Sequence, residues 1–161
     1  MSKLHDAADK GDVEEIVRLL RPEFTVDQTT VSKPFTALWC AVANRQVAAV
    51  KVLLEQGANP NLGYEDKTPL HMAAFGDNVE IARLLIEAGA DVNATTKTNN
   101  TPLHYSVRFG PASPEKFIEF LIGSGANVKS VNSDGYTPLR CARNEGRNKK
   151  IGAVPDSVEI C

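Results

Sequence analysis

Histidine and cysteine are the residues of this chain best suited to acid–base, nucleophilic or metal chemistry, and the chain contains three of each. A metal site needs several ligands that converge, and cysteine and histidine ligands usually show short C-x-x-C or C-x-x-H spacings. These residues are scattered here and show no such spacing. They are His5, His71 and His104, with Cys40, Cys141 and Cys161. The sequence therefore predicts no metal site and no cofactor.

The sequence also shows no recognisable group of catalytic residues. A catalytic nucleophile needs a base beside it, and many phosphate-binding enzymes carry a glycine-rich loop of characteristic spacing. Neither pattern occurs, and no pair of carboxylates lies in an apolar setting. We therefore predict that the protein is not an enzyme. Turnover that is lost on mutation of Cys40 or His71, without loss of folding, would revive the enzymatic alternative.

The stretch 68–93, which contains the central histidine, indicates a helix, a turn and a second helix. Thr68 is a typical N-cap and Pro69 a typical first helical residue, so one helix is expected to begin there. A heavier apolar stripe at helical spacing follows Asp77. It ends at Gly89, because glycine readily adopts the left-handed conformation found beyond many helices.

The same unit recurs along the chain. Its capping threonines are Thr36, Thr68, Thr101 and Thr137. They lie 32, 33 and 36 residues apart. This spacing clusters near the ~33-residue period of ankyrin repeats, whose T-P-L-H-x-A motif occurs at 68–73. From about Leu4 to about Ile151, the chain therefore resembles an ankyrin-repeat protein.

The resemblance implies an all-α fold, a solenoid of stacked helix-turn-helix units joined by β-hairpin-like loops. We expect one ankyrin-repeat domain over 1–152 and a flexible C-terminal tail over 153–161. The expected repeats, numbered one to five, are 1–32 (an N-terminal cap), 33–65, 66–98, 99–134 and 135–152 (a C-terminal cap).

Composition agrees with a protein of stacked helices, since 42% of its 161 residues are hydrophobic but only 6% are aromatic. A net charge of −2 gives no reason to expect general affinity for nucleic acid or membranes. The scattered cysteines and the acidic start argue against a secreted, disulfide-bonded protein. No apolar run approaches the ~18 residues of a membrane helix. We expect a monomer in the cytoplasm or the nucleus.

In the ankyrin family, the hairpin tips and the exposed face of each first helix form a concave groove that binds partners. The resemblance therefore implies a protein–protein interaction module, an adaptor or inhibitor, with a protein or peptide in this groove. Large and charged residues recur there, and tyrosine and arginine are frequent in binding hot spots. The predicted partner-binding residues are Tyr64, Phe75, Lys97, Arg108, Phe109 and Tyr136. Alternatively, some of the aromatic residues lie sideways between hairpins.

The family motif also implies structural roles. His71 and His104 are expected to bond the capping threonine and neighbouring backbone, and so to tie adjacent repeats together. Repeat two carries Trp39 in this position, so its turn is expected to be held by packing. Asn100, which directly precedes a capping threonine, is expected to face the groove.

Three features leave alternatives open. The last repeat is basic, which fits a solvated end, an acidic partner or nuclear import. Its cations are Arg140, Arg143, Arg147, Lys149 and Lys150. Asn93, with Leu85 eight residues before it, resembles the site that asparaginyl hydroxylases modify in ankyrin proteins. A host-directed ankyrin effector would show the same repeats.

Overall fold

The computed structural model describes residues 3–20, 25–29, 34–109 and 115–144. Within these ranges the chain forms helices, turns and loops, with one isolated β-bridge between Tyr64 and Lys67. The helices are α1 (Lys3–Lys10), α2 (Val13–Leu19), α3 (Ala37–Ala43), α4 (Val47–Glu55), α5 (Pro69–Gly76), α6 (Val79–Glu87), α7 (Pro102–Phe109), α8 (Glu115–Gly123) and α9 (Pro138–Asn144). The predicted all-α fold is confirmed.

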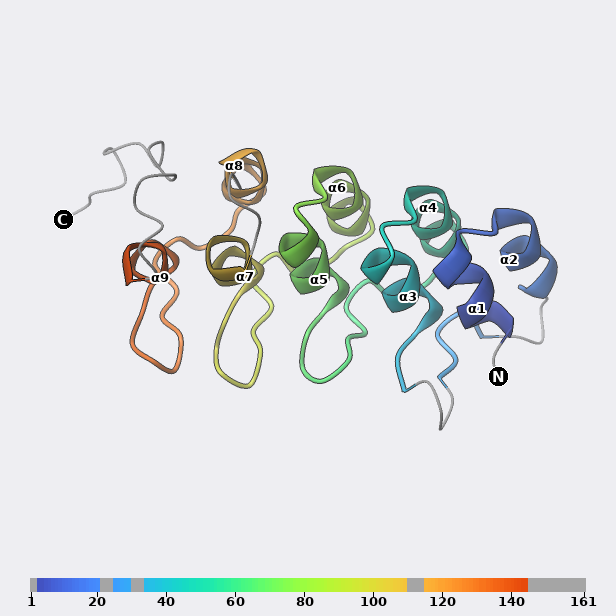
Figure 1. Ribbon diagram of the computed structural model, residues 1–161, viewed down its shortest axis with the longest axis horizontal. Coiled ribbons are helices and arrows are strands. Elements are labelled where there is room, and N and C mark those ends of the chain that lie inside the picture. The colour runs from blue at the N-terminus through green and yellow to red at the C-terminus, as the bar shows by residue number, and fades with distance from the viewer. Residues whose placement is uncertain (1–2, 21–24, 30–33, 110–114, 145–161) are drawn as a thin grey trace.

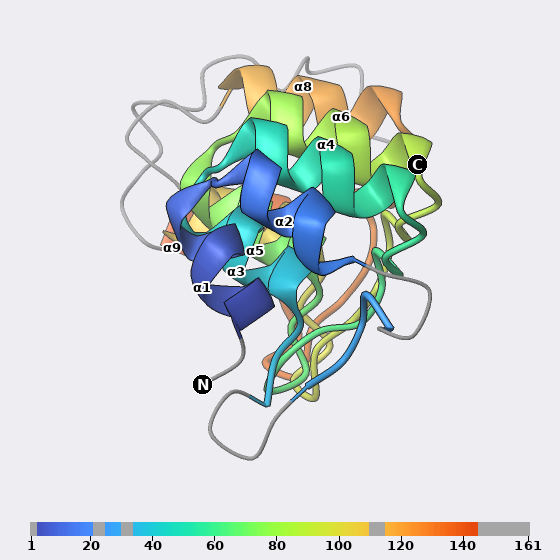
Figure 2. The ribbon, with the colours of Figure 1, turned by 90° about the vertical axis from the view of Figure 1, so that its right-hand side faces the viewer.

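The helices form two layers (Figures 1 and 2). The inner layer consists of α1, α3, α5, α7 and α9, each in contact with the next. The outer layer consists of α2, α4, α6 and α8, which contact one another in the same order and pack on the inner layer. Loops 62–67, 95–100 and 131–136, here called the finger loops, project from one edge of this array (Figure 1). The predicted solenoid of helix-turn-helix units is therefore confirmed.

The turn between α5 and α6 shows how each helical pair is specified locally. Thr68 has extended backbone (φ −78°, ψ 163°) and stands just before α5. α5 ends at Asp77, whose backbone is left-handed (φ 52°), and Asn78 then caps α6 by accepting a hydrogen bond from the Ile81 N–H at 3.0 Å. Gly89 follows α6 with φ 93°. The sequence correctly predicted the helix, the break and the second helix.

A continuous apolar core fills the space between the two layers. In the central repeat, Leu70 on α5 and both Ile81 and Leu85 on α6 are fully buried, with Ala73 and Ala74 almost as inaccessible. The alanines allow neighbouring inner helices to approach closely, and the larger side chains fill the space between the layers. Because each helix also contacts the matching helix of the neighbouring repeats, stacking adds to this burial and stabilises each unit.

Removing the hydroxyl of Thr68 should destabilise the fold modestly. The Thr68 Oγ1 atom lies 2.9 Å from Nδ1 of His71 at the start of α5. Thr68→Ala is therefore expected to lower the free energy of unfolding by about 1 kcal/mol, the typical effect of losing a helix cap. Denaturant melts measure this change. Thr95→Ala, at an exposed loop position, is the matched control, and an equal effect of both substitutions would contradict the capping role.

Some predictions concern residues outside the described ranges. They are the basic residues Arg147, Lys149 and Lys150, the thiol of Cys161 and the tail 153–161. Cys40 and Cys141 are buried thiols on α3 and α9. The boundaries of the five repeats stay predictions.

Candidate protein-binding surface

Three histidines connect inner helices to the loop that leads into the next inner helix. Nε2 of His71 on α5 lies 3.0 Å from the backbone oxygen of Asn100, and Nε2 of His104 on α7 lies 3.0 Å from that of Tyr136. Nε2 of His5 on α1 lies 2.7 Å from the backbone oxygen of Phe35. Each acceptor directly precedes a capping threonine. The predicted tie between adjacent repeats is confirmed for His71 and His104.

The second ring nitrogen of His71 and His104 shows which tautomer is present. The backbone N–H of Thr68 donates to Nδ1 of His71 at 3.2 Å, and the backbone N–H of Thr101 donates to Nδ1 of His104 at 3.2 Å. Because a backbone N–H can only donate, Nδ1 is the acceptor and the proton lies on Nε2. Burial, opposed by the hydrogen bond from Nε2 to a backbone oxygen, lowers the pKa of both imidazoles.

Mild acid should therefore destabilise the protein. In the unfolded chain both imidazoles titrate near the ordinary value of 6.5, whereas their pKa is lower in the folded state. Below this value the unfolded chain binds protons that the folded chain excludes, so the free energy of unfolding falls as the pH falls. The free energy of unfolding falls by at most about 1.4 kcal/mol per pH unit for each histidine. Urea melts at about pH 7.5 and about pH 5.5 measure the effect.

The control for this pH dependence replaces both imidazoles with groups that do not titrate. His71→Gln/His104→Gln should be less stable than wild type at neutral pH, because it loses two buried, hydrogen-bonded rings. It should also show a smaller change in urea midpoint between the two pH values. Equal pH dependence of the variant and wild type would contradict the role of these histidines.

His5 bonds the next loop through Nε2 as the other histidines do, and the sequence analysis missed it. The segment 4–8, LHDAA, differs from 70–74, LHMAA, at one position, so the signal was present. The first repeat lacks the Thr-Pro pair that begins repeats three to five, which concealed the match. In repeat two, Trp39 is buried, and its ring centroid lies 6.2 Å from that of Tyr64. Packing replaces the histidine there, as predicted.

Two of the six predicted partner-binding residues are partly engaged by the fold. Tyr64 is half-buried, and its ring packs edge-on against Phe35, with centroids 5.4 Å apart, and against Trp39. This is the sideways packing that the sequence left as an alternative. Tyr136 is also half-buried, and the guanidinium carbon of Arg140 lies 4.6 Å from its ring centroid. Both tyrosines therefore offer only part of their rings to a partner.

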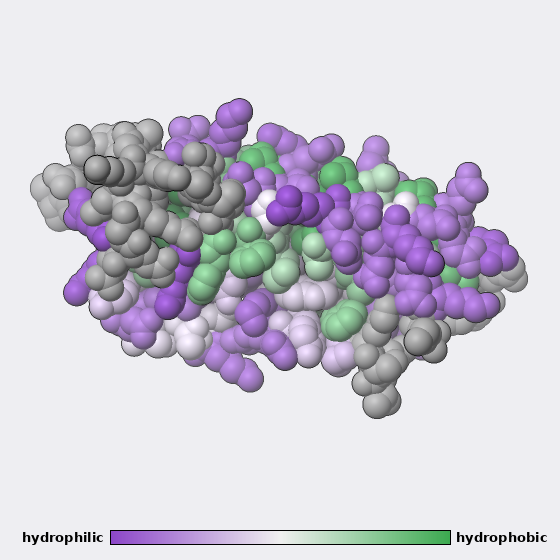
Figure 3. Space-filling model, in the orientation of Figure 1, coloured by the Kyte–Doolittle hydropathy of each residue, from purple (hydrophilic) through white to green (hydrophobic). Residues whose placement is uncertain are grey.

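Phe75 and Phe109, in contrast, lie at the surface. Phe75 at the end of α5 is 53% exposed, and Phe109 at the end of α7 is 42% exposed. The ring of Tyr105 joins this surface to the core, because its centroid lies 5.1 Å from those of both Phe109 and His71. Hydrophobic surface gathers over α5 and α7 on the face of the inner helices (Figure 3). Exposed aromatic residues of this kind often mark binding surfaces.

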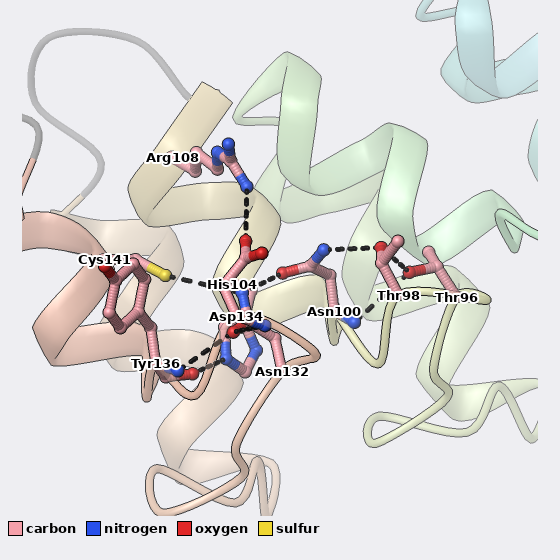
Figure 4. Close-up of polar contacts among 9 residues, drawn as sticks. All are labelled: Thr96, Thr98, Asn100, His104, Arg108, Asn132, Asp134, Tyr136 and Cys141. Atoms are coloured by element: carbon pink, nitrogen blue, oxygen red, sulfur yellow. Dashed lines mark hydrogen bonds and ion pairs between the residues drawn. The ribbon is translucent and has the colours of Figure 1, made fainter.

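The two predicted cations are Arg108, which lies beside this apolar surface, and Lys97, which lies on a finger loop. The guanidinium carbon of Arg108 is 5.2 Å from the ring centroid of Phe109, and its Nη1 atom is 3.9 Å from the carboxylate of Asp134 on the next finger loop (Figure 4). Lys97 is exposed on a finger loop, and its backbone N–H donates to the carboxylate of Asp66 on the preceding loop. The loops and inner helices therefore present aromatic and cationic groups together.

Buried asparagines hold the last two finger loops in place (Figure 4). Nδ2 of Asn132 donates to Oδ1 of Asn100 at 2.9 Å, and Nδ2 of Asn100 donates to the hydroxyl of Thr98 at 2.8 Å. Oδ1 of Asn132 accepts from the backbone N–H groups of Asp134 and Tyr136. Asn100 is only 6% exposed, so its predicted place on the groove surface is wrong. Its amide instead satisfies buried polar groups between loops.

Comparison with models of protein families agrees with this architecture. The model described as "Ankyrin repeats (3 copies)" matches residues 4–96, and the model described as "Ankyrin repeat" matches residues 98–133. The chain belongs to the ankyrin-repeat family. Ankyrin repeats are protein–protein interaction modules and are generally non-catalytic.

Several curated proteins contain similar ankyrin repeats. The chain is 34% identical over 155 residues to "Mitochondrial disaggregase" of Bos taurus, covering 92% of this chain and 22% of the relative. It is 32% identical over 146 residues to human "Transient receptor potential cation channel subfamily A member 1", covering 89% of this chain and 13% of the relative. It is 30% identical over 112 residues to "BRCA1-associated RING domain protein 1" of Caenorhabditis elegans, covering 69% of this chain and 16% of the relative. The chain thus spans less than a quarter of each relative.

Asparagines also join successive ankyrin repeats at the turns that follow the outer helices. The carboxamide of Asn61 donates to the backbone oxygen of Gly89 at 3.0 Å and accepts from the Asp91 N–H at 2.8 Å. Asn93 repeats this arrangement one unit later, with Gly125 at 3.1 Å and Asn127 at 2.7 Å. Both asparagines therefore link their repeat to the next one.

Among the helices of the described ranges, none is long and apolar enough to cross a membrane. Over the same ranges, no three or more histidine, cysteine or acidic side chains gather closely enough to hold a metal ion.

Proposed function

We propose that the chain is a non-enzymatic adaptor or inhibitor that binds a protein or peptide on its concave surface. This surface is formed by the inner helices and finger loops of repeats three to five. The observation that carries the proposal is the exposure of Phe75 and Phe109 at the ends of two neighbouring inner helices. Neither phenylalanine fills the core, whereas burying large aromatic side chains against a partner is a common source of binding energy.

The six predicted partner-binding residues take different parts in this proposal. Phe75 and Phe109 are the apolar anchors, and Arg108 stacks beside them. Lys97 and the accessible edges of Tyr64 and Tyr136 form the rim. The bonds of the buried histidines and asparagines hold this surface in one conformation before the partner arrives, which reduces the entropy lost on binding.

The first test is affinity capture from the native cell with three forms of the chain. They are the wild type, Phe75→Ala/Phe109→Ala, and Glu87→Ala, which alters an exposed residue of outer helix α6. A partner of the concave surface should be recovered with the wild type and Glu87→Ala but not with the double variant. Equal recovery with all three forms would contradict this site.

We propose that the chain acts as a monomer in the cytoplasm or nucleus, and the capture is made from these compartments.

A second candidate function is that of a substrate of an asparaginyl hydroxylase at Asn93. Its support is the sequence around Asn93, which follows Leu85 by eight residues. Because the Asn93 carboxamide is bonded to repeat four through both its nitrogen and its oxygen, the enzyme would act on a locally opened chain. Mass spectrometry of material from cells would show one added oxygen on Asn93. Unmodified Asn93 in cells with an active hydroxylase would contradict this function.

A further inference from the structure

The two helical layers differ in charge. Inner helices α5, α7 and α9 contain Arg108, Arg140 and Arg143 and no aspartate or glutamate. Outer helices α4, α6 and α8 contain more acidic residues than basic ones. Their charged residues are Lys51, Arg83 and Lys116 with Glu55, Glu80, Glu87, Glu115 and Glu119. The cations of the inner layer are therefore not a consequence of overall composition, since the chain carries a net charge of −2.

Helix stability accounts for only part of this inner-layer charge. The helix dipole favours cations in the last turn, where Arg108 and Arg143 lie on α7 and α9. Arg140, however, is the third residue of α9, where the dipole disfavours a cation. Its guanidinium lies over the ring of Tyr136. The position of Arg140 therefore calls for a reason other than the stability of α9.

Two of the inner-layer arginines are arranged to receive carboxylates. The guanidinium groups of Arg108 and Arg140 lie over aromatic rings, at 5.2 Å from Phe109 and 4.6 Å from Tyr136. Stacking of this kind covers one face of the guanidinium and leaves its N–H edge for hydrogen bonds to a carboxylate. Arg108 already reaches a carboxylate, at 3.9 Å on Asp134. Arg108 is half-buried and Asp134 is exposed, and so loose a pair contributes little stability, so a partner's carboxylate can replace that of Asp134.

Apolar and cationic surfaces follow one another along the array. Phe75 and Phe109 lie on α5 and α7, and the arginines lie on α7 and α9. We infer that the occupant of the concave surface is an acidic peptide segment that carries an apolar side chain. The apolar side chain packs on Phe75 and Phe109, and carboxylates on one side of it bind Arg108, Arg140 and Arg143. This inference rests on the proposed protein-binding function and specifies the chemistry of the partner.

Acidic residues on the finger loops favour a peptide over a nucleic acid. Asp66 and Asp134 border the same surface, and Glu65 lies 3.9 Å from Lys67 on its own loop. These carboxylates would repel a continuous polyanion, whereas a short peptide can place its few charges on α7 and α9 alone. The positive charge of this surface is therefore confined to α7 and α9, and an acidic peptide fits it better than a nucleic acid does.

The test selects binders for the full chain from a displayed library of random short peptides. The selected peptides should be enriched in aspartate and glutamate beside aromatic or aliphatic residues. They are then titrated against the wild type and three variants whose melting confirms folding. The variants are Arg108→Gln/Arg140→Gln, Phe109→Ala and the matched control Arg83→Gln. Arg83 stacks on Phe120 at 5.0 Å, as Arg108 does on Phe109, but it lies in the outer layer.

We expect the double arginine variant to weaken binding roughly tenfold or more, and increasing salt to weaken wild-type binding. Phe109→Ala should also weaken it, and Arg83→Gln should have no effect. Peptides that need Phe109 but show no acidic excess would overturn the acidic partner and leave the proposed binding function standing. Peptides insensitive to Phe109→Ala, or no enrichment, would contradict both. If single-stranded poly(U) RNA binds more tightly than the selected peptides, and through the same arginines, the surface belongs to nucleic acid and the inference is overturned.

Discussion

Replacing Leu85 with alanine is expected to lower the free energy of unfolding by about 2 to 5 kcal/mol. Leu85 is fully buried on α6, and α6 contacts the outer helices on both sides, α4 and α8. Alanine would leave a cavity in the middle of the array. Because neighbouring repeats pack against both sides of this helix, the cavity cannot close without disturbing the stack. Urea melts followed by helical circular dichroism measure the loss.

Leu62→Ala is the matched control for this prediction. Leu62 is 41% exposed on a finger loop, so the same substitution removes little buried surface there. We expect its effect to stay within about 0.5 kcal/mol. If Leu85→Ala melts at the same urea concentration as the wild type, the apolar stripe of α6 is not the stabilising contact described above.

The helical repeats could be predicted because their signals are local and recur. Thr68 marks the start of one helix, Asp77 and Asn78 mark the break, and Gly89 follows the second helix. Each of these residues acts through its own backbone conformation or a bond within a few residues. His71 and His104 were also placed correctly, because the family motif specifies both the residue and its role.

Side-chain packing between repeats was harder to predict. Tyr64 was expected at the surface, but it packs on Phe35 and Trp39, which lie more than twenty residues earlier. Asn100 is buried by its bond to Asn132, which belongs to the next repeat. Such contacts depend on how two loops stack, and no pattern within a single repeat encodes them. The surface exposure of Phe75 and Phe109 was predicted correctly, because both lie in the last turn of an inner helix whose buried residues come earlier.

Truncating Phe109 is expected to weaken partner binding about 30-fold or more, which corresponds to about 2 kcal/mol. The side chain is 42% exposed in the free protein and packs on Tyr105, so it can be buried further by a partner at little cost. Arg108→Ala should have a similar effect, because it removes the guanidinium that stacks on the same ring. Both variants should keep wild-type helicity and melting, since neither residue is part of the core.

The most direct measurement of the central claim is a titration of the captured partner against Phe109→Ala, Arg108→Ala and Glu87→Ala, each compared with the wild type. Glu87 is exposed at the end of outer helix α6, away from the inner layer. We predict a large loss of affinity for the first two variants and wild-type affinity for the third. Binding that survives both Phe109→Ala and Arg108→Ala but fails with Glu87→Ala would place the partner on the outer layer and contradict the proposed concave site.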